Sequence, residues 1–314
     1  MNRLNIQDLV NLIDLSDEKN IALRNDSLNK DAVKHGIQLQ ISRELNTNQE
    51  VDKLHGKFSP ARSFGERVKF LKESLLNSNT KSLVLGISGG VDSLTAGLMA
   101  QRAVDELNEE TTCEYRFIAV KLPYATQKDA EFVELSLNTI NPSKVYDLNI
   151  QKPVDEVNEQ LEVVYKDERK DSGQIDFIKG NIKARARMLS QYAIANATNG
   201  LVIGTDHAAE AVTGFFTKFG DGACDITPLT GLVKGQVREI AKHLGAPEEL
   251  YLKVATADLE ELSENKPDED ALGVSYQDID DFLLCKAVSD EVFSKILNQY
   301  MKTEHKRQQP ISLF

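Results

Sequence analysis

The sequence is poor in cysteine. Its three cysteines, Cys113, Cys224 and Cys285, are odd in number and widely separated. They therefore predict neither a disulfide framework nor a cysteine-based metal site. The residues after Met1 also lack the apolar core of a signal peptide. Together these absences favour a cytoplasmic protein, because reduced thiols are typical of that compartment.

Long apolar runs and an excess of basic charge are absent as well. No apolar run approaches the roughly 20 residues of a membrane helix, so no membrane contact is expected. Acidic residues (49) outnumber basic ones (37), which gives a net charge of −12. A nucleic-acid-binding surface needs basic stripes, so we expect no nucleic-acid partner. The charge balance still permits a local basic pocket for phosphate groups.

The most informative stretch runs from an apolar segment into a short run of serine and glycine. Residues Leu83–Ile87 predict a buried strand, and Leu94–Ala103 is a run of good helix formers that predicts a helix. A strand, a tight glycine turn and a helix N-terminus form an anion site in α/β proteins. Gly89 and Gly90 permit backbone conformations that bring main-chain N–H groups up to a phosphate.

The side chains of this turn suit a nucleotide bound with magnesium. Ser88 and Ser93 add hydroxyl donors, and Asp92 offers the hard oxygen ligand that Mg²⁺ on a phosphate needs. The turn is not a Walker A loop, because no lysine follows Gly90. Nor is it a dinucleotide fingerprint, because its glycines are adjacent and a third is missing. A plain glycine turn after a buried strand is the alternative interpretation.

Beyond this turn, strands and helices alternate along the chain. Such alternation predicts an α/β fold: a doubly wound, mostly parallel sheet with helices on both faces. Ligands bind at the carboxyl ends of strands in such sheets, so the segments after Ile87, Leu122 and Ile203 should converge. The predicted strands are Leu83–Ile87, Arg116–Leu122, Lys144–Leu148 and Leu201–Gly204, and the predicted helices are Ile37–Leu45, Phe64–Leu76, Leu94–Ala103, Asp129–Ile140, Val154–Val164 and Gly180–Ala197.

The remaining segments are interpreted as an arm and two loops. Residues 1–34 are polar and acidic apart from an amphipathic stretch over Leu9–Leu15, and we expect an accessory N-terminal arm with one short helix. Residues 35–314 then form one α/β domain. Pro123–Gln127 follows a strand end, and Asp258–Gly273 is acidic and poor in apolar residues. We expect both to be mobile loops that act as lids.

A second group of polar residues follows the predicted strand at 201–204. Thr205 is expected to cap the next helix, which places Asp206 and Glu210 on one face of it, four residues apart. Two carboxylates that face a phosphate loop suggest Mg²⁺ bound to ATP, whereas a capped, solvated helix start is the alternative. His207 is interpreted as structural, and zinc is disfavoured because no cysteine or histidine partners are suitably spaced.

Several segments together resemble one enzyme family. The glycine turn has the SGGxDS pattern of the ATP pyrophosphatases. From about residue 82 to the end, the chain is similar to the ammonia-dependent NAD synthetases of that group. The matching segments are Gly204–Gly222, Gly180–Met188, Leu122–Tyr124, Thr256–Leu259 and Thr303–Arg307. This resemblance implies a homodimer with the adenine nucleotide alpha hydrolase-like fold. It also implies the last step of NAD biosynthesis: deamido-NAD, ATP and ammonia give NAD, AMP and pyrophosphate through an adenylated intermediate.

The resemblance also assigns roles to single residues. It implies that Asp92 and Glu210 hold Mg²⁺, and that Asp92, Asp221 and Lys234 act in catalysis. The implied ATP contacts are Gly86, Ile87, Ser88, Gly89, Gly90, Val91, Asp92, Ser93, Thr205, Lys234 and Thr256. The implied deamido-NAD contacts are Arg185, Lys218, Asp225, His305 and Lys306. Because the family's dinucleotide site lies across the dimer interface, some of these residues would serve the partner's site.

On the residues alone, some of these roles stay open. Lys218 and Lys234 also suit ordinary surface positions, and the basic run 302–307 suits a helix end that complements the helix dipole. Arg185 and Arg187 lie two apart on one predicted helix and so face different ways. The resemblance selects Arg185.

The expected nitrogen donor is free ammonia. The roughly 80 residues before the glycine turn are too few for a glutaminase domain, and no cysteine precedes Cys113 to act as its nucleophile. Two alternatives remain. An ATP pyrophosphatase that modifies tRNA or forms GMP is disfavoured by the acidic charge and by the segment Gly204–Gly222. A non-catalytic nucleotide-binding module is disfavoured because Asp92 and Glu210 occur together.

Overall fold

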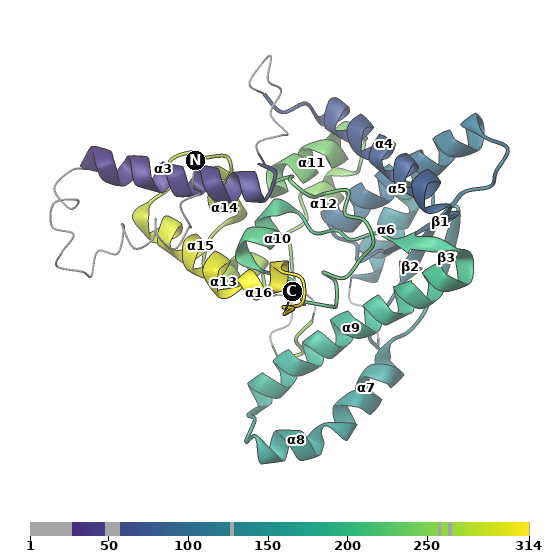
Figure 1. The fold of residues 1–314 in the computed structure, drawn as a ribbon. Coiled ribbons are helices and arrows are strands. Elements are labelled where there is room, and N and C mark those ends of the chain that lie inside the picture. The colour runs from purple at the N-terminus through teal and green to yellow at the C-terminus, as the bar shows by residue number, and fades with distance from the viewer. Residues whose placement is uncertain (1–26, 48–56, 126–128, 257–258, 263–265, 314) are drawn as a thin grey trace.

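A four-stranded parallel sheet lies at the centre of the molecule, with the strand order β3-β2-β1-β4 (Figure 1). The computed structural model describes residues 27–47, 57–125, 129–256, 259–262 and 266–313. The strands are β1 (Ser82–Gly86), β2 (Arg116–Lys121), β3 (Lys144–Asp147) and β4 (Gly200–Val202). Ser82 of β1 lies in register with Arg116 of β2 on one side and with Gly200 of β4 on the other.

Helices make up most of the rest of the described chain. None of them, within the ranges given above, is long and apolar enough to cross a membrane. The helices are α3 (Ser27–Glu44), α4 (Pro60–Ser78), α5 (Val91–Glu110), α6 (Ala130–Ile140), α7 (Gln151–Gln160), α8 (Glu162–Asp167), α9 (Ser172–Thr198), α10 (Ala208–Thr213), α11 (Lys234–His243), α12 (Glu248–Tyr251), α13 (Asp268–Leu272), α14 (Tyr276–Leu283), α15 (Asp290–Lys302) and α16 (Glu304–Arg307).

The side chains of β1 alternate between two apolar layers, as expected for a strand buried on both faces. Leu83 and Leu85 pack on one face with apolar residues of α4, α5, α6 and α11. Val84 packs on the other face, where Val154 of α7 and Ala195 of α9 are buried. The predicted parallel sheet with helices on both faces is therefore confirmed.

The strand order reverses between β1 and β4. From β1 the chain passes through α5 to β2 and through α6 to β3, so the sheet grows toward one edge. Helix α9 then returns the chain to the opposite side of β1, where β4 pairs with it. In doubly wound sheets, the crevice at such a reversal is where ligands bind.

A second apolar core lies beside the sheet and contains residues of α3, α10, α14 and α15. Figure 1 shows α3, α14 and α15 grouped on the side away from β3. Ile37 and Ile41 of α3 are fully buried there. The Gln38 amide donates to the carbonyl groups of Phe282 (3.2 Å) and Lys286 (2.9 Å). Helix α3 is therefore an integral part of the folded body.

Five predicted helices differ from the observed ones by more than one residue, among them α4, which begins at Pro60 instead of Phe64. Helix α3 begins at Ser27, before the predicted start, and α5 spans Val91–Glu110, well beyond the prediction. Helix α9 begins at Ser172, because the carboxylate of Asp171 accepts the Gln174 N–H (2.8 Å) and caps it there. The helix predicted over 154–164 is divided into α7 and α8.

The prediction of a continuous loop over 258–273 is wrong in its last part. Residues Asp268–Leu272 form α13, which starts directly after Pro267, a residue whose fixed φ suits a helix start. Asp258 itself lies outside the described residues, as do Gln127 and the helix predicted over 9–15. The division of the chain at residue 34 stays a prediction.

Candidate active site

A cavity of about 440 Å³ opens at the carboxyl ends of the strands. Ile87, Leu122 and Ile203, each at the end of a strand, all line it, so their predicted convergence is confirmed. Ser88 after β1 and Thr205 after β4 lie on the same wall. The cavity thus occupies the crevice created by the reversal of strand order.

The glycine turn is braced by its own hydroxyl groups. The backbone N–H of Ser88 donates to Ser93 Oγ (3.3 Å), which in turn donates to the Gly90 carbonyl (3.1 Å). Gly89 has a φ of +79°, and a Cβ there would lie 3.0 Å from the backbone nitrogen of Val133. Gly90 has a φ of −91°, so only Gly89 needs the conformational freedom of glycine.

Helix α5 begins directly after this turn and presents its N-terminus to the cavity. Its N-cap, Gly90, provides no side-chain hydrogen bond to the first turn. The first N–H groups of a helix lack partners within the helix, and the helix dipole adds partial positive charge there. The start of this 20-residue helix therefore suits a phosphate group.

Asp92 and Lys234 form a buried ion pair beside this helix N-terminus. Lys234 Nζ donates to Asp92 Oδ2 (2.7 Å), and only 1% of the lysine is exposed. Burial by itself raises the pKa of Asp92, but the charge and hydrogen bond of Lys234, together with other nearby basic groups, outweigh it and the pKa is lowered. Burial likewise opposes the charge on Lys234, yet Asp92 and Glu210 raise its pKa. The lysine is therefore a fixed positive charge at the phosphate loop.

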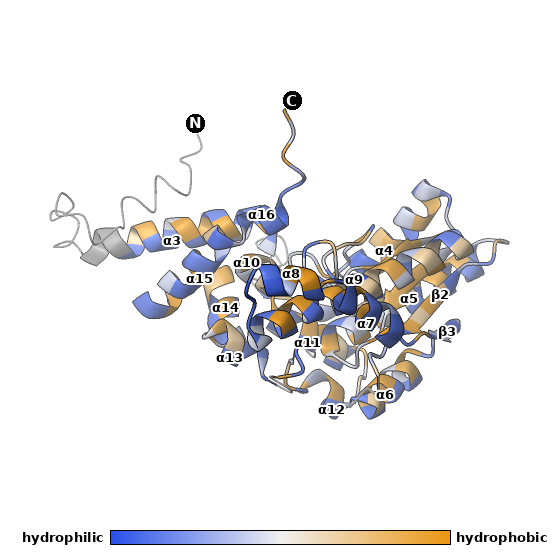
Figure 2. Ribbon diagram, turned by 90° about the horizontal axis from the view of Figure 1, so that it is seen from below, coloured by the Kyte–Doolittle hydropathy of each residue, from blue (hydrophilic) through white to orange (hydrophobic). Residues whose placement is uncertain are grey.

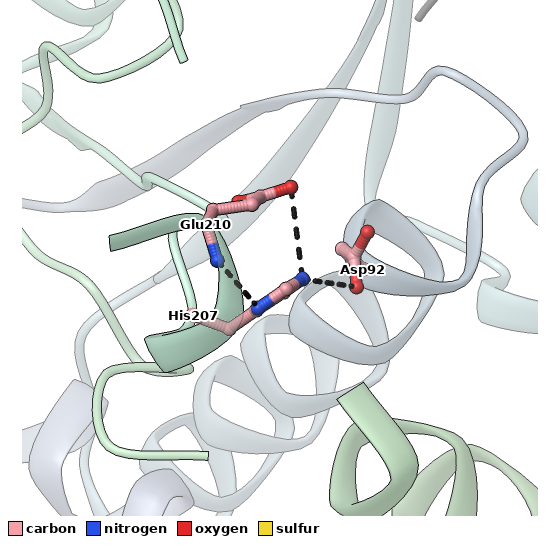
Figure 3. Close-up of side chains that lie close together, drawn as sticks. All are labelled: Asp92, His207 and Glu210. Atoms are coloured by element: carbon pink, nitrogen blue, oxygen red, sulfur yellow. Dashed lines mark hydrogen bonds and ion pairs between the residues drawn. The ribbon is translucent and has the colours of Figure 1, made fainter. Parts of the chain in front are cut away.

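His207 connects this pair to Glu210 (Figure 3). It is the N-cap of α10, because its Nδ1 accepts the backbone N–H of Glu210 (3.4 Å). Burial lowers the pKa of His207 to about 3, so the ring is neutral and carries its proton on Nε2. Nε2 lies 3.5 Å from Asp92 Oδ1 and 3.6 Å from Glu210 Oε1. His207 thus orients both carboxylates.

This capping corrects two predictions. Thr205 was expected to cap the helix, but His207 does so, and α10 begins only at Ala208. Asp206 therefore precedes the helix and does not share a helical face with Glu210. The interpretation of His207 as structural is confirmed, and its contact with the carboxylates adds to that role.

The acidic side chains at the cavity repel one another. Burial, together with the charge of Asp92, raises the pKa of Glu210 well above its ordinary value. Burial and the charges of Asp221 and Asp92 raise the pKa of Asp206 to about 7. A divalent cation here would relieve this repulsion.

The residues present fit magnesium. Oxygen atoms of Asp92 and Glu210 and a nitrogen of His207 lie within 4.8 Å of one another. Because His207 has its proton on Nε2 and accepts a hydrogen bond at Nδ1, it offers no free lone pair to a metal. The available ligands are then two carboxylates, and Mg²⁺ is typically held by one or two carboxylates plus substrate phosphates and water. The two predicted metal ligands are thus brought together.

Three of the residues predicted to contact the dinucleotide contact one another, although none of them lines the cavity. An Arg185 Nη donates to the Lys218 carbonyl (3.2 Å), and Lys218 Nζ donates to the carbonyls of His305 and Gln308. Arg185 is exposed on the outer side of α9 and does not line the cavity of its own chain. Arg187 does line the cavity, and its Nε donates a hydrogen bond to the Leu122 carbonyl (3.1 Å).

Lys306 and Asp221 lie on the cavity wall, as does Thr256. Lys306 Nζ donates to the carbonyls of Gly214 and Phe216, both at 2.8 Å. Burial lowers its pKa, although the charge of Asp221 opposes that shift. The Asp221 carboxylate accepts the backbone N–H of Thr217 (2.9 Å).

Asp225 makes hydrogen bonds within its own chain, and its predicted contact with the dinucleotide stays a prediction. Its Oδ2 accepts the backbone N–H of Val202 (2.8 Å), and its Oδ1 accepts the hydroxyl of Tyr192 (3.3 Å). These bonds tie the segment around Asp225 to β4 and α9, and Asp225 does not line the cavity of its own chain.

The structure adds residues to the site that the motifs did not indicate. Lys253 Nζ lies 2.7 Å from Asp129 and 3.4 Å from the Gly89 carbonyl, on the cavity wall. Asp268 accepts the hydroxyl of Tyr276 (3.0 Å), whose ring lies 4.9 Å from Lys234 Nζ. The acidic, polar character of the 258–273 segment was a signal for Asp268 alone.

Comparisons with known proteins agree with this geometry. A protein-family model described as NAD synthase matches residues 64–310. The chain belongs to this NAD synthase family. The predicted family is therefore confirmed.

Relatives and solved structures extend the similarity over most of the chain. The NH(3)-dependent NAD(+) synthetase of Aliivibrio fischeri is 50% identical over 275 residues, which are 86% of this chain and 97% of the relative. The same enzyme of Stutzerimonas stutzeri is 57% identical over 248 residues, which are 78% and 88% of the two chains.

Two solved structures show the same fold. The NAD+ synthetase of Burkholderia pseudomallei has a TM-score of 0.72 and 40% identity and covers 87% of this chain and 97% of its own. The NMN synthetase of Francisella tularensis has a TM-score of 0.69 and 33% identity and covers 82% and 99%. A member of this family with an intact charged site is a ligase rather than a non-catalytic binding module.

Proposed function

We propose that this chain catalyses the ATP-dependent amidation of deamido-NAD by ammonia. The products are NAD, AMP and pyrophosphate. The observation that carries the proposal is the buried group of Asp92, Glu210 and Lys234 beside the uncapped N-terminus of α5. The similarity to NH(3)-dependent NAD(+) synthetases over most of the chain supports the choice of substrate.

The first step joins the substrate carboxylate to AMP. A carboxylate oxygen attacks the α-phosphorus of ATP, and the bond to the bridging oxygen breaks, so negative charge collects on pyrophosphate. Lys234 and the N–H groups at the start of α5 are placed to stabilise that charge. Mg²⁺, held by Asp92 and Glu210, would neutralise further charge on the phosphates.

The second step forms the amide. Ammonia attacks the carbonyl carbon of the adenylate, and AMP leaves with the oxygen that it took from the carboxylate. Ammonium must first lose a proton, and Asp221 on the cavity wall is the acceptor that we propose. Arg185, Lys218, His305 and Lys306 are proposed to bind the dinucleotide.

The function is tested by product stoichiometry. The purified chain with ATP, Mg²⁺, deamido-NAD and ammonium should release NAD, AMP and pyrophosphate in equal amounts. ADP and orthophosphate would refute the proposal. The corresponding mononucleotide should be assayed in parallel, because one structural relative is named an NMN synthetase; a higher kcat/KM for the mononucleotide would move the substrate assignment to it.

The metal and phosphate roles are tested by Asp92→Asn. The variant should lose activity by about 100-fold, because a ligand and the partner of Lys234 are weakened together. Asp105→Asn is the matched control, since Asp105 is exposed on the same helix. Equal turnover in the two variants would contradict the assignment.

We further propose a cytoplasmic homodimer in which Arg185 serves a site shared with the partner. The cysteines are free, which supports a reducing compartment. Apolar side chains are exposed on α8 and α9, where Val163 (61%), Phe177 (60%) and Leu189 (66%) stand out. Figure 2 shows this apolar colouring on α8 and α9. Such an exposed apolar face suits an interface between copies of the chain.

The dimer is tested by sedimentation of the purified chain. Leu189→Glu should yield a monomer with reduced activity, because a charge would be buried at the interface. Leu76→Glu on α4, where the leucine is 50% exposed, is the control and should leave the dimer intact. A wild-type monomer, or a Leu189→Glu dimer, would refute this part.

A further inference from the structure

Outside the phosphate site, a second group of buried charges lies on α9. The carboxylate of Asp176 accepts two backbone N–H groups, from Glu261 (2.9 Å) and from Leu262 (2.8 Å). Asp176 is only 7% exposed. Its partners belong to residues Leu259–Leu262, which we call the docked segment. A carboxylate that accepts two N–H groups makes strong, charge-assisted hydrogen bonds.

Lys183, about two turns further along α9, holds the same segment. Its Nζ donates to the Leu259 carbonyl (2.9 Å) and lies 2.9 Å from Glu261 Oε1. Its side chain is only 4% exposed, and its ammonium lies 4.2 Å from the centre of the Tyr124 ring. Tyr124 follows β2, so Lys183 links the docked segment to the end of that strand.

The backbone of α9 is adapted to this contact. Gly180 lies between Asp176 and Lys183, and a Cβ there would lie 3.2 Å from the Leu259 Cβ. Glycine weakens a helix interior, so its presence here is explained by the close approach of the segment. Lys179 adds an ion pair with Glu261 (3.1 Å).

The docked segment is held mainly by polar contacts. The side chain of Leu262 is 67% exposed, so little apolar area secures the segment. Segments held by hydrogen bonds with few buried apolar contacts open at low free-energy cost. Without the segment, Asp176 and Lys183 would face solvent on α9 and lose their partners.

The docked segment also forms part of the active-site cavity. Leu259 and Glu260 line it together with Gly180, Ala184 and Thr256. Because Leu259 follows Thr256 by only three residues, holding Leu259 limits the positions that Thr256 can take. This step rests on the proposed function, because Thr256 is a proposed ATP contact.

We propose that Asp176 and Lys183 are positioning residues that keep Leu259–Leu262 on α9 and so place Thr256 for ATP. Neither residue touches the reacting atoms. Their loss should weaken ATP binding more than it slows the chemical step.

The test combines kinetics with proteolysis. Asp176→Ala and Lys183→Met should each raise KM for ATP by about tenfold with a smaller change in kcat, because a docked segment loses charge-assisted hydrogen bonds. A glutamate-specific protease should cleave after Glu260 and Glu261 faster in both variants. Lys183→Arg keeps the charge and should restore most of the ATP affinity. Asp176→Asn, which keeps one acceptor oxygen, should be intermediate.

The matched control is Asp171→Ala, which removes the N-cap of the same helix without touching the segment. It should lower Tm and leave KM for ATP and the cleavage rate unchanged. An unchanged cleavage rate in Asp176→Ala would overturn the docking, and faster cleavage with unchanged KM would overturn its link to ATP. The variant Thr256→Ala separates the two proposals. An unchanged KM for ATP in this variant refutes the ATP contact of Thr256. The cleavage rates of the Asp176 and Lys183 variants still test whether these residues hold the docked segment.

Discussion

The ammonium of Lys234 lies 2.7 Å from Asp92 and is almost fully buried. At the residue scale, each of these charges is stable only because the other is present. Removing one partner of a buried ion pair leaves an uncompensated charge, which typically costs about 3–5 kcal/mol. We therefore expect that replacing either residue by an uncharged one destabilises the folded state.

Cys224 offers a test of the electrostatics near Asp206 that does not depend on catalysis. Burial, with the nearby charges of Asp206 and Asp225, raises the pKa of its thiol to about 12. A raised pKa means less thiolate, so at pH 8 about one thiol in 10⁴ is reactive. We expect iodoacetamide to label the exposed Cys113 rapidly and Cys224 very slowly, as measured by mass spectrometry.

The rate at Cys224 should keep rising as the pH is raised from 8 to 11, because its thiolate is still forming. In denatured protein, Cys224 should react readily. Fast labelling of native Cys224 at pH 8 would show that its surroundings are wetter and less acidic than the structure indicates.

At the scale of elements, His207 joins a helix cap to the metal ligands. His207→Ala should lose about 1 kcal/mol of folding free energy with the cap. His207→Asn keeps an acceptor at the capping position but cannot reach Asp92. It should keep Tm and lose about tenfold in kcat, the usual cost of a lost supporting contact. Equal kcat in His207→Asn and wild type would show that the capping alone matters.

The same histidine predicts how stability responds to acid. Its pKa is lowered from 6.5 to about 3 on folding, so between these values the unfolded chain binds a proton that the folded chain does not. Stability from this group is present above pH 6.5 and is lost as the pH falls toward 3. The Tm of His207→Asn should therefore fall less than that of wild type between pH 7 and pH 5. A parallel fall in both would contradict the buried neutral ring.

The end of α10 is fixed by a glycine with two constraints. Gly214 has a φ of +65°, and a Cβ there would lie 2.2 Å from the Thr303 Cβ, at the start of α16. Gly214→Ala should cost about 2–4 kcal/mol, from backbone strain and overpacking together. Gly245, with a φ of +78° and nothing within 4 Å, is the control for strain alone.

Gly245→Ala should therefore cost only about 1 kcal/mol. Chemical denaturation of the two variants measures the difference. Equal losses would show that α10 does not pack closely against the α15–α16 junction.

At the scale of the whole molecule, the sequence predicts the bounds of the strands better than those of the surrounding helices. Apolar runs that end in glycine or polar residues mark the buried strands β1 and β2, and the exposed β3 and the short β4 are also predicted with nearly correct bounds. The start of α9 depends on a cap by Asp171, and α13 is a short helix in a polar segment, so neither has a strong periodic signal. Helix α3 began earlier than predicted for the same reason.

The sequence predicts those active-site residues that belong to recognisable motifs. The glycine turn and Asp92 were identified from their pattern, Glu210 was indicated by its position after the strand at 201–204, and the role of Lys234 came from the family resemblance. Their convergence, which the sequence predicts from the strand ends, takes place where the strand order reverses. Lys253 and the contact of His207 with Asp92 were missed, because each joins segments far apart in the sequence, and the capping by His207 was missed because Thr205 was expected to cap.

The central claim is that the substrate carboxylate attacks the α-phosphorus of ATP at the glycine turn. It is tested most directly by supplying deamido-NAD with both oxygens of its nicotinate carboxylate labelled with ¹⁸O. Mass spectrometry of the products should find one labelled oxygen in AMP, the other in the amide of NAD, and none in pyrophosphate. Label in orthophosphate, with ADP as the other product, would show attack at the γ-phosphorus and contradict the account.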